Sequence, residues 1–240
     1  MVAPLGVGRT SKVLELASGS GACTLLLSGK CPEGEVICLE ASSEMIRLAR
    51  RNIRSAGCKN VTLIRGDVKR LSELGPARFD FVVCNSAFWQ FAEPERLLRA
   101  ISEVLKPGGT LTFNLPIWHR TKRKAKEFRE VIDEVLTRHG INPADYWEKR
   151  RPVDYRAILK DCGFVRVRES RYSVPLTAAA RDEWRRIPAF KERRRDLRGV
   201  SRKVSDEVRV ELRNRGQTGK LPRAVHHPRW RLITARNRSG

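Results

Sequence analysis

The alternation of short apolar runs with helical segments between Val13 and Leu115 is the feature that most constrains this fold. The apolar runs have the length of buried strands: Val13–Leu16, Glu35–Glu40, Val61–Asp67, Phe79–Asn85 and Thr110–Leu115. Segments with helical periodicity lie between several of these runs, and one of them begins near Pro94. A repeated strand–helix rhythm predicts a mostly parallel sheet with helices on both faces.

The second half of the chain continues this rhythm after a longer interruption. A helix is predicted for 152–164, a sixth strand begins at Phe164, and a last strand covers Trp230–Arg236. We therefore predict an α/β, Rossmann-like sheet of seven strands, mostly parallel, with a helical insertion before the last strand. The expected organisation is a single domain, 1–240, with a core of 13–175 and 229–236 and a helical lid or substrate insertion at about 176–228.

The net charge of +22 is distributed unevenly along the chain. Residues 1–120 carry +5 and residues 121–240 carry +17. A positive field of this size attracts nucleic acid, anionic lipid or anionic substrates. Acidic residues are nevertheless interleaved through the basic runs, as in Lys191 to Lys203. We favour solvated helix faces over a docking surface, so nucleic acid is the less favoured partner.

The cysteines and the apolar segments exclude several other classes of protein. The six cysteines are scattered without a CxxC pair, which argues against zinc and against a disulfide framework. No metal site is predicted. No run is long enough for a secretory signal or a membrane span. We expect a cytoplasmic protein that acts on a small molecule.

The segment "LELASGSGAC" predicts a strand that turns tightly into a helix, which leaves backbone N–H groups directed at a ligand. Gly19 and Gly21 alone do not identify that ligand, and Thr24 stands where a dinucleotide fingerprint has its third glycine. Glu40 ends the second strand, where its carboxylate can accept hydrogen bonds from both hydroxyls of a ribose. Asp67 ends the third strand, where it can reach an adenine amino group.

Taken in order, "LELASGSG", "CLEAS", "RGDV", "FDFVVCNSAFWQF" and "LRAISEVLKPGGTL" resemble the motifs of class I S-adenosylmethionine-dependent methyltransferases. The resemblance covers Val13 to Leu115 and the remainder in outline. It implies S-adenosyl-L-methionine as the cofactor. The residues that it assigns to cofactor binding gather around the ends of four strands: Glu15, Ala17, Ser18, Gly19, Gly21, Glu40, Ala41, Met45, Asp67, Val68, Asn85 and Ser86.

On the acceptor side, the resemblance places Asn85 beside the sulfonium, and Phe88 and Trp89 near the transferred methyl group. His119 follows the fifth strand and is a further candidate for the pocket. The catalytic candidates are Asn85, Trp89 and His119. "CNSAF" lacks both prolines of the Asn/Asp-Pro-Pro-aromatic signature of enzymes that methylate the exocyclic amines of nucleic-acid bases.

These features predict a methyltransferase for a small or medium-sized metabolite, acting at oxygen, nitrogen or carbon. Three alternatives stay open. An RNA methyltransferase would dock its substrate on the basic second half. A nicotinamide-dependent oxidoreductase is disfavoured by the absent third glycine and by Asp67. A cofactor-binding protein without catalysis is compatible with Ala17, which replaces a common glycine.

Overall fold

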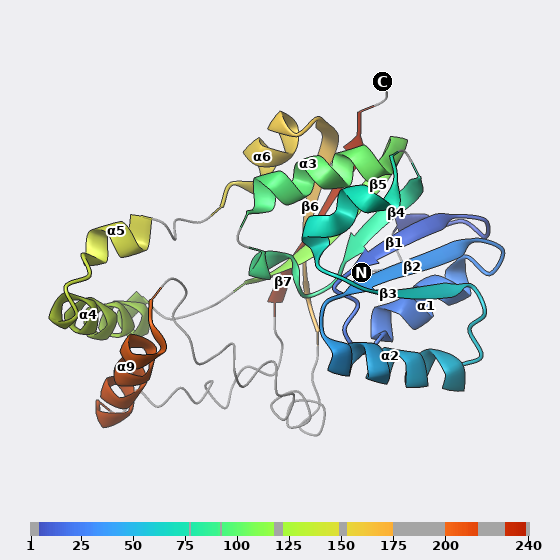
Figure 1. Ribbon diagram of the computed structural model, residues 1–240. Coiled ribbons are helices and arrows are strands. Elements are labelled where there is room, and N and C mark those ends of the chain that lie inside the picture. Colours follow the sequence, from blue (N-terminus) through green and yellow to red (C-terminus); the bar gives the residue numbers. More distant parts are fainter. Residues whose placement is uncertain are drawn as a thin grey trace. The chain divides into compact units, whose positions relative to one another are not determined.

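The computed structural model describes residues 5–76, 78–91, 93–117, 122–148, 153–174, 200–215 and 229–238. The chain divides into two compact units (Figure 1). The first comprises Met1–Pro116, Asp154–Tyr172 and Trp230–Gly240. The second comprises Ile117–Val153 and Ser173–Arg229. None of the helices in the described ranges is long and apolar enough to cross a membrane.

Seven strands form one sheet in the order β3-β2-β1-β4-β5-β7-β6. Their bounds are β1 Lys12–Leu16, β2 Glu35–Glu40, β3 Val61–Arg65, β4 Phe79–Cys84, β5 Leu105–Ile117, β6 Phe164–Ser173 and β7 Arg229–Asn237. The β1–β2, β1–β4, β2–β3 and β4–β5 pairs are parallel. The predicted fold class, a mostly parallel seven-stranded α/β sheet, is confirmed.

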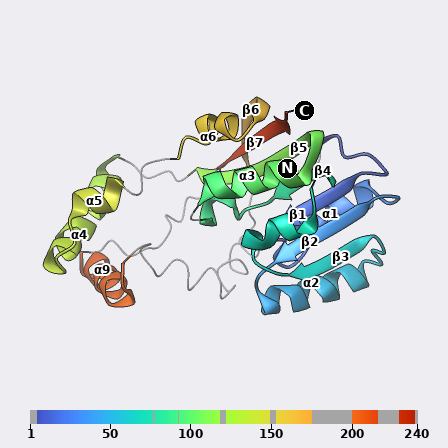
Figure 2. The same cartoon turned by 45° about the horizontal axis from the view of Figure 1, so that its top comes forward.

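The helices of the first unit lie on opposite faces of this sheet (Figures 1 and 2). One face carries α1 (Ala22–Lys30) and α2 (Ser43–Ser55), and the other carries α3 (Pro94–Val104) and α6 (Tyr155–Asp161). Ser42 caps α2, because its Oγ accepts a hydrogen bond from Met45 N at 3.3 Å. Two short 3₁₀ helices, η2 (Val68–Leu74) and η3 (Phe88–Gln90), follow β3 and β4.

Alternation along each strand divides the apolar side chains between two cores. Leu14 and Leu16 belong to the cluster that includes α3 and α6, whereas Val13 packs in the cluster that includes α1. The segment "KPGG" does not form a separate turn before β5. That segment is already part of β5, and its pairing with β4 shifts register between Phe79 and Phe81, so it forms an irregularity within a strand.

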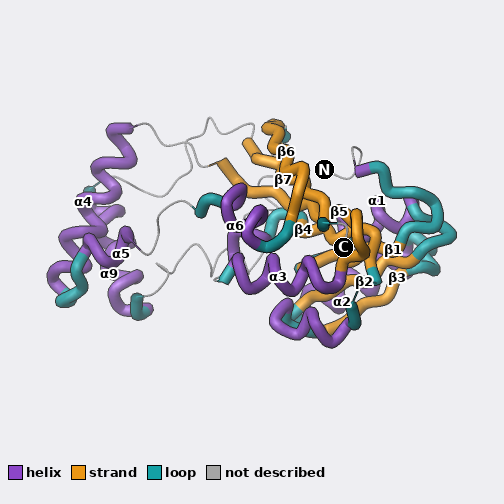
Figure 3. Tube along the Cα trace, turned by 90° about the horizontal axis from the view of Figure 1, so that it is seen from above, coloured by secondary structure: helices purple, strands orange, loops and turns teal. Residues whose placement is uncertain are grey.

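The second unit has its own hydrophobic core. Its described helices are α4 (Lys122–Arg138), α5 (Pro143–Glu148) and α9 (Arg202–Asn214), and α4 contacts both of the others (Figure 3). The buried residues at their contacts are Ile132, Val135, Leu136, Tyr146, Val204 and Val208. Of the expected insertion, only 200–215 lies within the described residues, and the single-domain organisation stays a prediction.

Candidate functional site

The turn between β1 and α1 is open at its centre. Gly19 has a φ of +57°, and a Cβ added there would meet no atom within 4 Å. Gly21, with a φ of +85°, instead packs close to Ala49 of α2, where an added Cβ would lie 3.4 Å from the alanine Cβ. Free space over Gly19 and close helix packing at Gly21 are the two properties that a turn beneath a ligand requires.

The Glu40 carboxylate ties the turn to the next strand. Its Oε2 accepts a hydrogen bond from Gly19 N at 2.9 Å, and its Oε1 accepts one from Ser42 N at 2.8 Å. The side chain is 9% exposed. Since each carboxylate oxygen can accept a second hydrogen bond, the predicted ribose contact remains compatible with this geometry.

Glu15 of β1 is buried, and its side chain faces α1. Its Oε2 accepts a hydrogen bond from Thr24 Oγ1 at 2.5 Å and a weaker one from Cys38 Sγ at 3.6 Å. Desolvation raises the pKa of Glu15 to about 7. The carboxyl is therefore engaged with α1 and β2 side chains, and its predicted place beside the methionine moiety stays a prediction.

The remaining cofactor candidates follow β1, β2 and β3. Ser18 is buried, Met45 and Val68 are half-buried, and Ala41 is exposed. The exposed Asp67 caps η2, because its Oδ1 accepts a hydrogen bond from Lys69 N at 3.0 Å. Parallel pairing brings these strand ends to one edge of the sheet. Their individual ligand contacts stay predictions.

A network of side chains joins the ends of β4, β5 and β6. Asn114 of β5 is 1% exposed, and its Oδ1 accepts a hydrogen bond from Ser86 N at 2.5 Å. Its Nδ2 donates to Asn85 Oδ1 at 3.0 Å and to the Tyr172 hydroxyl oxygen at 2.8 Å. Sequence analysis missed Asn114 and Tyr172. The available signal was a polar residue inside the apolar run "TLTFNL".

Two residues at this edge adopt a strained backbone. Ala17 and Ser86 have φ values of +52° and +60°, in the left-handed region that side chains disfavour. They follow β1 and β4, which are adjacent in the sheet. Strain of this kind concentrates at ligand sites and persists where the surrounding structure enforces it.

The aromatic candidates after β4 differ in burial. Phe88 is fully buried, and its ring stacks on Phe113 with centroids 3.9 Å apart. Its expected place near the methyl group is therefore wrong, and it belongs to the core. Trp89 is half-buried and packs against that core, so its catalytic role stays a prediction. His119 lies outside the described residues.

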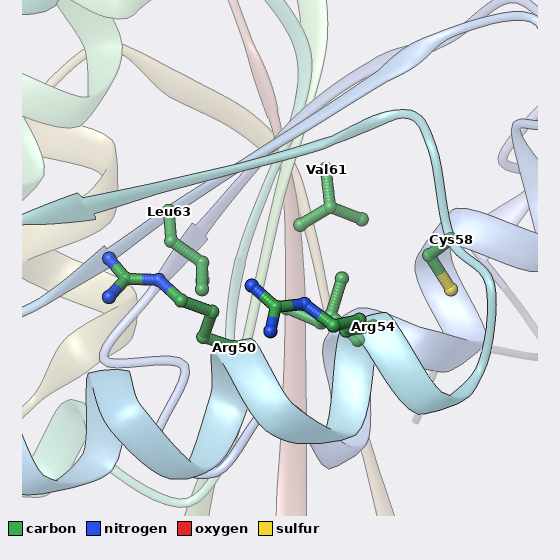
Figure 4. A pocket seen from close by; sticks show the side chains of 6 residues that line it. Arg50, Arg54, Cys58, Val61 and Leu63 are labelled. Atoms are coloured by element: carbon green, nitrogen blue, oxygen red, sulfur yellow. The ribbon is translucent and has the colours of Figure 1, made fainter.

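A hollow of about 360 Å³ lies elsewhere, between α2 and the edge strand β3 (Figure 4). It is lined by Arg50, Ile53, Arg54, Cys58, Val61 and Leu63. None of the cofactor candidates lines it, so this hollow is separate from the strand-end site. Within the described ranges, no group of three or more His, Cys, Asp or Glu side chains could hold a metal ion.

Comparison with known proteins identifies the family. Residues 13–109 match the family model of a methyltransferase domain. The chain carries a class I, S-adenosylmethionine-dependent methyltransferase domain. The cofactor of such domains is S-adenosylmethionine. The open turn at Gly19 and the carboxylate of Glu40 fit that cofactor, because they offer free space and a hydrogen-bond acceptor at neighbouring positions.

The curated relatives of this methyltransferase domain act on different acceptors, according to their names. Malonyl-[acyl-carrier protein] O-methyltransferase of Paenibacillus sp. (strain JDR-2) is 28% identical over 139 residues, 58% of this chain and 49% of the relative. The ubiquinone/menaquinone biosynthesis C-methyltransferase UbiE of Wigglesworthia glossinidia brevipalpis is 33% identical over 120 residues, 47% of this chain and 46% of the relative. The chain thus spans about half the length of these relatives.

Solved structures share the fold of the methyltransferase domain. YcgJ of Bacillus subtilis superimposes with a TM-score of 0.62 at 17% identity, covering 99% of this chain and 96% of that one. The phosphoethanolamine N-methyltransferase 2 of Haemonchus contortus, solved with phosphomonomethylethanolamine and S-adenosylhomocysteine, has a TM-score of 0.56 at 18% identity, covering 98% of this chain and 51% of that one.

Proposed function

We propose that this protein transfers the methyl group of S-adenosylmethionine to a small or medium-sized metabolite. The observation that carries the proposal is the link between Gly19 and Glu40, which sets an open turn beside a carboxylate at the ends of two adjacent parallel strands. An acid at that position suits a ribose, and the turn suits the methionine part of the same ligand.

The proposed roles follow from position along the strand ends. Glu40 orients the ribose, and Asp67 and Val68 border the adenine. Asn85 and Ser86 stand at the end of β4, beside the expected position of the reacting centre. When bound, the cofactor supplies an activated methyl carbon, so the protein needs to supply orientation and exclusion of water.

The names of the curated relatives favour a metabolite over a nucleic acid. One relative is an O-methyltransferase and another a C-methyltransferase. In the second unit, several basic residues already pair with acids: Arg215 contacts Glu134, and Arg138 contacts Glu207 at 3.1 Å. Ion-paired arginines present less free charge to an RNA backbone. Docking of RNA is therefore the weaker proposal.

Calorimetry with S-adenosylmethionine, S-adenosylhomocysteine and NADH tests the cofactor. We expect the first two to bind and NADH not to bind, and tight binding of NADH alone would end the methyltransferase proposal. A cell extract supplied with labelled methyl donor then tests the acceptor. We expect the label in the small-molecule fraction, whereas label confined to RNA would replace the metabolite with a nucleic acid.

A further inference from the structure

The orientation of the Asn114 amide is fixed by a backbone group. Ser86 N can only donate a hydrogen bond, so the Asn114 atom that it contacts at 2.5 Å is the carbonyl oxygen, Oδ1. The other end of the amide, Nδ2, can only donate. It lies 3.0 Å from Asn85 Oδ1 and 2.8 Å from the Tyr172 hydroxyl oxygen.

This orientation determines which protons remain for a ligand. Asn85 uses its Oδ1 to accept from Asn114 Nδ2 and, at 3.4 Å, from Ser86 Oγ. The two N–H donors of the Asn85 NH₂ group therefore take no part in these hydrogen bonds. The Tyr172 oxygen accepts from Asn114, so its own O–H proton is also left over. Among the residues that the structure describes, neither set of donors meets an acceptor.

Both donor groups stand at the ends of β4 and β6, and Asn85 is also one of the cofactor candidates. Asn85 follows β4 and Tyr172 ends β6, and each lies within 3.0 Å of the same Nδ2 atom of the buried Asn114. Asn85 and Tyr172 are half-buried and Asn114 is fully buried. Burial also raises the pKa of Tyr172, so its hydroxyl stays protonated as a donor at neutral pH.

We propose that Asn85 Nδ2 and the Tyr172 hydroxyl form an acceptor subsite that binds an oxygen anion, such as a carboxylate, phenolate or enolate. The inference rests on the proposed function and narrows its substrate class. An oxygen with free lone pairs satisfies both donor groups. A neutral amine has a single lone pair, so it can accept from only one of the two donor groups and brings its N–H groups against the other, because Asn85 Oδ1 is already engaged.

Binding of two small probes to the full chain saturated with S-adenosylhomocysteine tests the subsite. Benzoate is the oxygen anion, and aniline is an amine of similar size that is uncharged at pH 7.5. Their dissociation constants are measured by ligand-observed NMR. We expect benzoate to bind the wild type at least about tenfold more tightly than aniline, since hydrogen bonds to charged groups are stronger than neutral ones.

Two isosteric variants remove the donors. Tyr172→Phe deletes the hydroxyl, and Asn85→Asp replaces the NH₂ group with a carboxylate oxygen. We expect each to weaken benzoate binding by about tenfold or more. The matched controls are Tyr146→Phe and Asn142→Asp in the second unit, where an aspartate can still accept from Ala144 N as Asn142 does. Neither control should change benzoate binding.

Affinity for S-adenosylhomocysteine is measured first in every variant. If the wild type fails to bind it, the proposed function fails. Two results would overturn the oxygen-anion subsite while the proposed function stands, provided that the wild type binds S-adenosylhomocysteine. One is an equal dissociation constant for aniline and benzoate. The other is wild-type affinity for benzoate in both Tyr172→Phe and Asn85→Asp.

Discussion

The two halves of the sheet's carboxyl edge use their polar side chains differently. At the ends of β1, β2 and β3, carboxylates accept hydrogen bonds from backbone N–H groups, as Glu40 does from Gly19 and Ser42. At the ends of β4, β5 and β6, an amide and a phenol are held by a buried amide. The first half holds loops in place with carboxylates, whereas the second holds Ser86 with the Asn114 amide and also leaves donors for a ligand.

Because of this difference, substitutions in the two halves should affect the stability of the fold and the choice of ligand to different degrees. A substitution in the cofactor half removes a partner from the backbone, so it changes the fold and the ligand site together. A conservative substitution of Asn85 or Tyr172 leaves the bond between Ser86 N and Asn114 in place. The acceptor half should therefore change its ligand preference while the loops keep their conformation.

The largest expected effect concerns Glu15 and the dependence of stability on pH. Its pKa rises from an ordinary value of 4.5 to about 7 on folding, so the native state holds the proton more tightly. The free energy of unfolding should fall as pH rises from about 4.5 to about 7, by about 3 kcal/mol, and then level off. Urea unfolding of the wild type and Glu15→Gln at several pH values measures this. If the free energy of unfolding changes with pH equally in both proteins, burial does not raise the pKa of Glu15.

The next effect concerns Glu40. Glu40→Ala should lower affinity for S-adenosylhomocysteine by about 2–3 kcal/mol, because charge-assisted hydrogen bonds to the ribose are lost. It should also destabilise the fold by about 1–3 kcal/mol, since Gly19 N and Ser42 N lose their acceptor. Calorimetry and urea unfolding measure both. Glu33→Ala, which removes an exposed ion pair with Arg9, is the control. Unchanged affinity in a folded variant would place Glu40 away from the ribose.

A smaller effect is expected at Trp89. Trp89→Ala should reduce turnover of the true substrate by more than about tenfold, or about 1.4 kcal/mol, with little change in cofactor affinity. A thermal melt, a cofactor titration and a rate measurement on the same sample check this. A large drop in melting temperature with full activity per folded molecule would assign Trp89 to the core that it borders.

The smallest effect is expected at Ala17. Ala17→Gly should relieve the strain of the left-handed backbone at φ +52°. The greater conformational freedom of glycine in the unfolded chain offsets part of that stabilisation. The net gain should be at most about 1 kcal/mol. Urea unfolding measures it, and a loss of stability would mean that the alanine methyl group contributes packing that outweighs the strain.

The sequence predicted those features that depend on nearby residues. The strand β2 was expected at Glu35–Glu40 and is found there, and the Ser42 cap follows from the same local pattern. The cofactor candidates could also be proposed, because their motifs are short and each follows a strand directly. Parallel pairing then sets them along one edge without further information.

The contacts within the acceptor half could not be predicted, because they join distant positions. Asn114 and Tyr172 are 58 positions apart, and nothing local in "FVRVRESRYS" marks that tyrosine. The misplacement of Phe88 has a related cause. An aromatic residue after β4 suits a pocket wall equally well, and only its stacking on Phe113 of the neighbouring strand assigns it to the core.

The strand order has a consequence for how the protein is made. Among the strands of the described ranges, β6 stands at the edge of the sheet and pairs only with β7, which comes from 229–237. A nascent chain can therefore assemble β3-β2-β1-β4-β5 early, while β6 waits for residues that are synthesised more than fifty positions later. A ribosome that stops before Arg229 would release the cofactor half of the edge complete, but without the strand that holds β6, and with it the Tyr172 hydroxyl, in the sheet.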